Sequence, residues 1–152
     1  MLGTGHALQT AVSAHPTWFD SPFLLSATDY IFPLSFFAAL QARYVGTGAD
    51  IVVSMKAVPP EELSGRSSVR FAGDLVVEEV VEKPAPGTAP SPYAANLIYI
   101  LPAAIAAGLK EIEPSARGEY EIQTAVNVLI RRGMRARGLL QIPLPEWTPP
   151  AD

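Results

Sequence analysis

The chain alternates short apolar runs with segments in which apolar residues recur at helical spacing. Short runs rich in β-branched or aromatic residues and bounded by Gly, Pro or Asp predict buried strands. Longer segments that start near proline or glycine predict helices. Strands are predicted at 23–28, 50–58, 69–71, 75–81, 93–101 and 138–144, and helices at 6–14, 33–46, 103–112 and after Gly118.

Two local patterns strengthen this interpretation. The helix after Gly118 carries its apolar residues on one face, at Ile122, Ala125, Val126, Leu129 and Ile130. The strands at 69–71 and 75–81 can pair as a hairpin across the Ala-Gly-Asp sequence between them. Repeated strand–helix–strand alternation predicts an α/β fold, a three-layer sandwich with a mainly parallel, mixed central sheet. The absence of internal repeats and long linkers predicts one domain over 1–152.

Composition excludes several classes of function. The 152 residues carry a formal charge of −4, which disfavours binding to a nucleic-acid backbone. There is no cysteine, so disulfides, thiolate catalysis and cysteine-ligated metals are excluded. The most apolar stretch, 94–109, is interrupted by Asn96 and Pro102 and is too short to cross a bilayer. No signal peptide is visible, so a soluble, cytoplasmic protein without a membrane partner is the default expectation.

Candidate chemistry begins with Glu82 and Lys83, in the sequence VVEEVVEKP. They stand where a predicted strand meets a proline-rich loop, and ligands of α/β proteins collect at such strand ends. A surface ion pair is the alternative. Asp29 follows another predicted strand and could hold Mg²⁺ beside phosphate oxygens, or could cap the next helix. Gly3 opens a Gly-Thr-Gly turn whose backbone N–H groups could approach a nucleotide, although a plain turn also explains it.

The motifs, taken in order, resemble the sugar-phosphate nucleotidylyltransferase family, which includes glucose-1-phosphate thymidylyl- and uridylyltransferases and mannose-1-phosphate guanylyltransferases. They are GTGHAL at 3–8, FLLSATD at 23–29, VVEKP at 80–84, YAANLIY at 93–99 and GEYE at 118–121. The resemblance covers nearly the whole chain and implies a Rossmann-like nucleotidyltransferase fold. It also implies a reaction in which a sugar 1-phosphate oxygen attacks the α-phosphate of a nucleoside triphosphate, Mg²⁺ assists and pyrophosphate leaves.

The resemblance also implies roles for single residues. Gly3 matches a glycine that approaches the nucleotide base, and Asp29 matches the aspartate that binds catalytic Mg²⁺. Glu82 matches a glutamate that hydrogen-bonds sugar hydroxyls, and Lys83 matches the lysine that binds the sugar phosphate. Tyr99 matches an aromatic near the sugar pocket, or is a core residue. Asp29 and Lys83 are therefore the expected catalytic residues, because bringing two polyanions together requires neutralisation of charge.

The chain departs from the family pattern in several places. The glycine-rich triphosphate loop with its arginine and lysine has no counterpart, which predicts a fold that is incomplete at its N-terminus. Ser67 and Ser68 stand where a glycine is common, and Leu97 replaces a glycine beside the sugar. Trp147 leads into TPPAD without a match for the second metal-binding aspartate, since Asp152 lies too far along.

Two hypotheses follow. The chain is either part of a sugar-1-phosphate nucleotidylyltransferase and inactive alone, or a non-catalytic binding or regulatory relative. A glycosyltransferase is disfavoured, because Asp29-Tyr30-Ile31 lacks the paired acids of a metal site. Loss of the first strand would expose a hydrophobic sheet edge, which favours a homo-oligomer.

Overall fold

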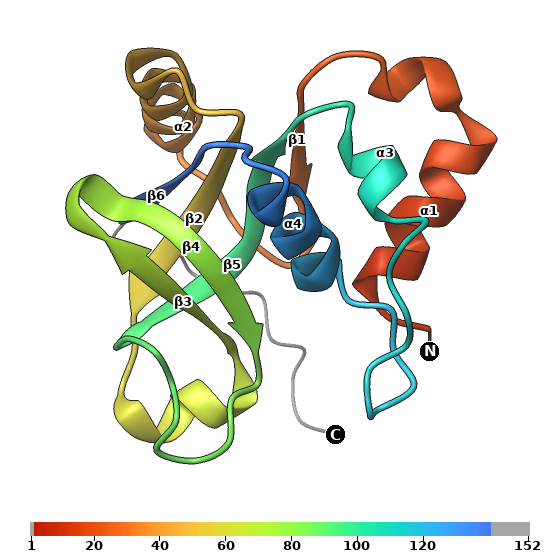
Figure 1. Cartoon of the computed structure of the whole chain (residues 1–152). Coiled ribbons are helices and arrows are strands. Elements are labelled where there is room, and N and C mark those ends of the chain that lie inside the picture. The colour runs from red at the N-terminus through yellow and green to blue at the C-terminus, as the bar shows by residue number, and fades with distance from the viewer. Residues whose placement is uncertain (1, 141–152) are drawn as a thin grey trace.

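The computed structural model describes residues 2–140, which form one β-sheet with helices packed against it (Figure 1). The strand order is β1-β5-β2-β6-β4-β3. The strands are β1 (Phe23–Ser26), β2 (Ile51–Ala57), β3 (Ser67–Ala72), β4 (Val76–Glu82), β5 (Tyr93–Leu101) and β6 (Ala136–Leu140). The α-helices are α1 (Thr4–Ala14), α2 (Leu34–Thr47), α3 (Ile105–Gly108) and α4 (Ile122–Arg131), and short 3₁₀ turns occupy Pro16–Phe19, Pro60–Gly65 and Gly73–Leu75.

The α/β class and the mixed sheet are confirmed, but the prediction of a mainly parallel sheet is wrong. Among the strand pairs of residues 2–140, only β2 and β6 run parallel. Helix α2 does connect two strands of the same direction, β1 and β2, yet β5 lies between them in the opposite direction. The alternation of strands and helices along the sequence shows which two strands a helix connects. It does not show whether a third strand lies between them in the sheet.

The sheet closes on itself except at β1. Strand β3 pairs with both β4 and β5, so β5, β2, β6, β4 and β3 form a closed circuit. Strand β1 stands outside this circuit and, within the described residues, pairs only with β5. Its Leu24 is 42% exposed. An uncharged strand with an open edge favours association, so a homo-oligomer remains a prediction.

Side chains alternate between the two faces of the sheet and build two hydrophobic clusters. On β5, Tyr99 and Leu101 join the larger cluster, which also contains residues of α1, α3 and α4. Ile98 points to the other face and packs with Phe36 and Leu40 of α2. Figure 1 accordingly shows α2 apart from the other three α-helices. Burial on both faces explains why β2 and β5 are mostly apolar along their length instead of alternating apolar and polar residues.

Helix positions were predicted well where apolar residues recur at regular helical spacing. Of the residues predicted for the apolar face of α4, Ile122, Ala125, Val126 and Leu129 are buried and Ile130 is partly buried. The helix predicted at 103–112 is too long, because α3 forms a single α-helical turn. After it, the N–H groups of Lys110 and Glu111 donate to the carbonyl oxygens of Ala107 and Gly108, three residues back, as in turns.

Part of the strand predicted at 138–144, together with Trp147 and Asp152, lies outside the described residues. No helix within residues 2–140 has the length and apolar character needed to cross a membrane.

Candidate functional site

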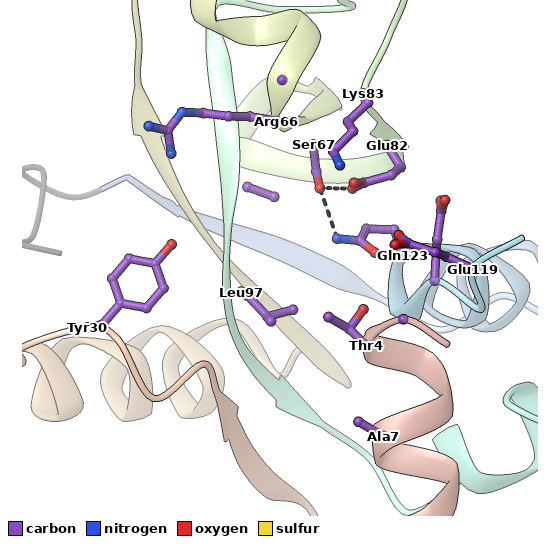
Figure 2. A pocket seen from close by; sticks show the side chains of 14 residues that line it. Thr4, Ala7, Tyr30, Arg66, Ser67, Glu82, Lys83, Leu97, Glu119 and Gln123 are labelled. Atoms are coloured by element: carbon purple, nitrogen blue, oxygen red, sulfur yellow. Dashed lines mark hydrogen bonds between the residues drawn. The ribbon is translucent and has the colours of Figure 1, made fainter. Parts of the chain in front are cut away.

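A pocket of about 420 Å³ collects residues from six separate segments of the chain. Residues of α1 and its N-cap (3–7) and the segment that leads into α4 (119–123) form one side, and residues 65–67 and 82–83 form the other. Ala95 and Leu97 of β5, together with Tyr30, complete the lining. Because Glu82 and Lys83 carry its most distinctive chemistry, we name it the Glu82–Lys83 pocket. Figure 2 shows their side chains directed into this space, near Ser67 and Gln123.

Glu82 is held at the end of β4 by the register of the hairpin. Ser67 of β3 lies directly opposite Glu82. The Ser67 hydroxyl donates a hydrogen bond to Glu82 Oε2, and Gln123 Nε2 donates to Ser67 Oγ at 2.9 Å. Only 16% of the Glu82 side chain is exposed. The carboxylate therefore has a defined orientation before any ligand arrives.

Arg117 balances the acidic side of the pocket. Its Nη2 lies 3.4 Å from Glu82 Oε1 and 2.7 Å from Glu121 Oε1, and its Nε lies 3.9 Å from Glu119 Oε2. One guanidinium thus forms ion pairs with three carboxylates. Its positive charge lowers the repulsion that the carboxylates would otherwise exert on each other and on an anionic ligand. Arg117 and Glu121 are four positions apart in the sequence.

Ser67, Gln123 and Arg117 are site residues that the sequence analysis missed. Ser67 was noted only as a departure from a glycine, although the hairpin register places it opposite Glu82. The four-residue spacing of Arg117 and Glu121 was also readable in the sequence. No sequence signal points to Gln123, because its contact with Ser67 joins residues 56 positions apart.

Lys83 adopts an unusual backbone conformation. Its φ is +43°, in the left-handed region that favours glycine, and its N–H donates to Arg66 O at 3.0 Å. This turn ends β4 and leaves an exposed lysine at the pocket. Strained non-glycine residues cluster at functional sites, so the conformation supports a functional role for Lys83.

Gly3 is the N-cap of α1 and also lines the pocket. Its φ is +87°, and a Cβ added there would lie 2.5 Å from the Tyr120 carbonyl oxygen. Glycine is therefore required by backbone conformation and by close packing against the 118–121 segment. The N–H of Gly5 donates to Tyr120 O at 2.8 Å, so this first-turn donor is already used inside the protein. The predicted approach of Gly3 to a nucleotide base stays a prediction.

Tyr99 lies in the hydrophobic core, and the pocket wall on β5 is made by Ala95 and Leu97 instead. Its side chain is fully buried, and its hydroxyl has no hydrogen-bond partner within residues 2–140. Burial, with smaller effects from the charge of Glu82 and from Tyr30, raises the pKa of the Tyr99 hydroxyl above its ordinary range. This placement fits the core role that the sequence analysis kept as the alternative.

Replacement Tyr99→Phe is expected to stabilise the protein by about 1–2 kcal/mol, because an unbonded buried hydroxyl costs free energy. The unfolded chain loses the tyrosine proton near pH 10 while the folded protein keeps it, so native stability falls as the pH rises above about 10. Tyr99→Phe should weaken this alkaline loss. Urea unfolding at pH 7 and pH 10.5 measures both effects, with Tyr44→Phe as control. A destabilised Tyr99→Phe protein would show that the hydroxyl has a partner.

Asp29 is exposed in the turn after β1, and its neighbour Tyr30 lines the pocket. Asp29 itself is not among the lining residues. The alternative of a helix cap is wrong, because α2 begins at Leu34 with Pro33 as its N-cap and no side-chain cap bond. A metal role for Asp29 therefore remains a prediction.

The described residues do not enclose a metal ion. Within residues 2–140, no three or more His, Cys, Asp or Glu side chains are grouped so that they could hold one. Mg²⁺ usually keeps several waters and binds through one or two carboxylates and substrate phosphates. The exposed carboxylate of Asp29 suits a Mg²⁺ ion that arrives with a triphosphate better than a resident ion.

Comparison with known proteins gives a consistent assignment. The Nucleotidyl transferase family model matches residues 1–142. The UTP–glucose-1-phosphate uridylyltransferase of Klebsiella pneumoniae is 32% identical over 146 residues, covering 86% of this chain and 47% of the relative. The corresponding enzyme AglF of Haloferax volcanii is 34% identical over 132 residues, covering 86% and 51%.

Solved structures agree with the sequence relatives. A UDP-glucose pyrophosphorylase in complex with UDP-glucose superposes with a TM-score of 0.73 and 26% identity, over 91% of this chain and 54% of that chain. The chain thus spans about half the length of the curated relatives it matches. The match extends along the sequence and the fold alike, and this chain belongs to the sugar-phosphate nucleotidylyltransferase family.

Proposed function

We propose that this chain carries the sugar-phosphate site of a sugar-1-phosphate nucleotidylyltransferase, which converts a nucleoside triphosphate and a sugar 1-phosphate to a nucleoside diphosphate sugar and pyrophosphate. The observation that supports this most directly is the convergence of Gly3, Glu82 and Lys83, from distant parts of the sequence, on one pocket. UTP and glucose 1-phosphate are the first ligands to test, since the relatives are named for them.

In this proposal Lys83 neutralises the phosphate of the sugar phosphate, and Glu82 accepts hydrogen bonds from sugar hydroxyls. Glu82 is suited to this task because Ser67 and Arg117 already fix its orientation. A phosphate oxygen of the sugar phosphate forms a bond to the α-phosphorus, and the bond to the β-phosphate oxygen breaks. In-line displacement of this kind needs positioning and charge neutralisation more than covalent participation of the protein. Mg²⁺ bound to the triphosphate would stabilise negative charge on its oxygens, with Asp29 as the proposed protein ligand.

A non-catalytic binding or regulatory role is the second candidate. Both carboxylate oxygens of Glu82 already have protein partners, and Leu97 lines the pocket at a position where the family resemblance implies a glycine. The two candidates differ in one product. Release of pyrophosphate from UTP, glucose 1-phosphate and Mg²⁺ by this chain supports the enzyme and overturns the regulatory role, whereas binding of glucose 1-phosphate without release fits both the regulatory role and a part of the enzyme that is inactive alone.

The metal role predicts that Asp29→Asn removes the Mg²⁺ dependence of UTP binding while the melting temperature stays nearly unchanged. The expected stability follows from the exposure of Asp29, since surface substitutions usually change stability by less than about 0.5 kcal/mol. Calorimetric titration of UTP with and without Mg²⁺ measures the effect, and Asp20→Asn is a matched control at another exposed aspartate. Unchanged Mg²⁺ dependence in Asp29→Asn would remove Asp29 from the metal site.

A further inference from the structure

Leu97 separates the Glu82–Lys83 pocket from a second cavity. The second cavity has a volume of about 410 Å³ and lies between α1 and β1. The two cavities share three lining residues, Thr4, Ala7 and Leu97. Since Thr4 and Ala7 are small, Leu97 supplies the largest shared side chain. Figure 2 shows it directed toward Thr4, away from Lys83 and Glu82.

The second cavity has an apolar character that the first lacks. Leu8, Phe19, Phe23 and Leu25 belong to its lining, and no charged residue does. The Glu82–Lys83 pocket, in contrast, includes both acidic and basic side chains. Leu97 is therefore the point at which a charged pocket meets an apolar interior.

Leu97 lies at an irregularity of β5. The partners of Val53 and Met55 on β5 are Tyr99 and Ala95, so three residues of β5 stand opposite the single residue Ser54. The buried side chain of Asn96 donates to Ser54 Oγ at 3.1 Å across this irregularity. Strand irregularities near active sites can redirect side chains, and Leu97 lies within this one.

The position of Leu97 has a chemical consequence for any bound sugar phosphate. With the phosphate of the ligand at Lys83 and sugar hydroxyls at Glu82, the part of the sugar directed toward β5 would meet the Leu97 side chain, which lines the same pocket. A hydroxyl pressed against these methyl groups would lose its hydrogen bonds to water and gain none. A CH₂ or CH₃ group at the same place would lose nothing and would bury apolar surface.

We propose that Leu97 is a specificity-determining residue, which selects deoxy sugar phosphates over their fully hydroxylated counterparts. This inference rests on the proposed function, because it assumes that the Glu82–Lys83 pocket holds a sugar phosphate. It adds the substrate class: a sugar 1-phosphate that lacks a hydroxyl on the side facing β5.

The test is calorimetric titration of the full chain with glucose 1-phosphate and its 2-, 3-, 4- and 6-deoxy analogues. At least one analogue is expected to bind about tenfold more tightly than glucose 1-phosphate, as the loss of one hydrogen bond implies. In Leu97→Ala this preference should fall to about threefold or less, because water regains access to the hydroxyl. Leu25→Ala is the matched control, because Leu25 lines the apolar cavity and does not line the Glu82–Lys83 pocket. This variant should still bind the deoxy analogue more tightly than glucose 1-phosphate.

Each other outcome counts against a defined claim. If glucose 1-phosphate binds and no deoxy analogue binds more tightly, the role of Leu97 is wrong while the proposed function stands. An equal loss of preference in Leu97→Ala and Leu25→Ala would attribute the effect to general packing and would overturn the role of Leu97. If no sugar phosphate binds to the protein or to Leu97→Ala, the proposed function fails and this inference fails with it.

Discussion

Replacement of Lys83 by alanine is expected to weaken binding of glucose 1-phosphate by about 10- to 100-fold. Lys83 is the exposed cation at the end of β4 that lines the pocket. A hydrogen bond to a charged group contributes about 1.5–3 kcal/mol, which corresponds to this range of affinity. The comparison of glucose 1-phosphate with free glucose by calorimetry isolates the phosphate, because only the phosphate ester should lose affinity.

The Lys83 variant needs controls for charge and for backbone strain. Lys110→Ala removes the same charge at an exposed position outside the pocket and should leave binding unchanged. Alanine is the better replacement at position 83, because glycine would also relieve the strain of φ +43° and change the local backbone. An equal loss of affinity for glucose and for glucose 1-phosphate would rule out the phosphate role of Lys83.

The largest effect on stability is expected for Leu129→Ala, at about 2–5 kcal/mol. Leu129 is 1% exposed and belongs to the cluster between α4, α3 and the sheet. Gly108 of α3 approaches α4 so closely that an added Cβ would lie 3.2 Å from Ala125 O and 3.6 Å from Leu129 Cδ2. Because the two helices already touch at this point, they cannot easily close the space left by the removed side chain.

Urea unfolding measures the loss, and Leu34→Ala is a matched control. Leu34 is 87% exposed, so the same truncation there should change the free energy of unfolding by less than about 0.5 kcal/mol. A similar loss in both variants would mean that α4 does not contribute its apolar face to the core as the structure indicates. The pair thus tests the packing on which the position of Gln123, and with it the Ser67 contact, depends.

The sequence was most informative where one periodicity dominated. Strand β5 was predicted with both bounds correct, because a run of apolar residues between Pro92 and Pro102 leaves little choice of element or length. Four of the five residues predicted for the apolar face of α4 are buried for the same reason, while Ile130 is partly buried. The length of α3 was wrong, because the apolar pattern continues through residues whose backbone forms turns.

The site was partly predictable. Gly3, Glu82 and Lys83 were singled out in the sequence, and the structure brings them to one pocket. The partners of Glu82 were not predicted, because the bonds of Ser67, Arg117 and Gln123 depend on side-chain directions that a linear pattern does not contain. The place of Tyr99 in an apolar strand did not show whether it belongs to the core or to the pocket. Alternate residues on one face of the strand line the pocket at one end and pack in the core at the other.

Periodicity and residue chemistry are local properties of the chain, and they were enough to predict most strands and helices, the α/β class and the charged pair Glu82 and Lys83. Three features became visible only in the folded protein: β5 lies antiparallel between β1 and β2, Leu97 lines the pocket while Tyr99 is buried, and Arg117 contacts three carboxylates. These features arise from contacts between segments far apart in the sequence. Such contacts depend on the burial of the whole sheet, which no single segment specifies.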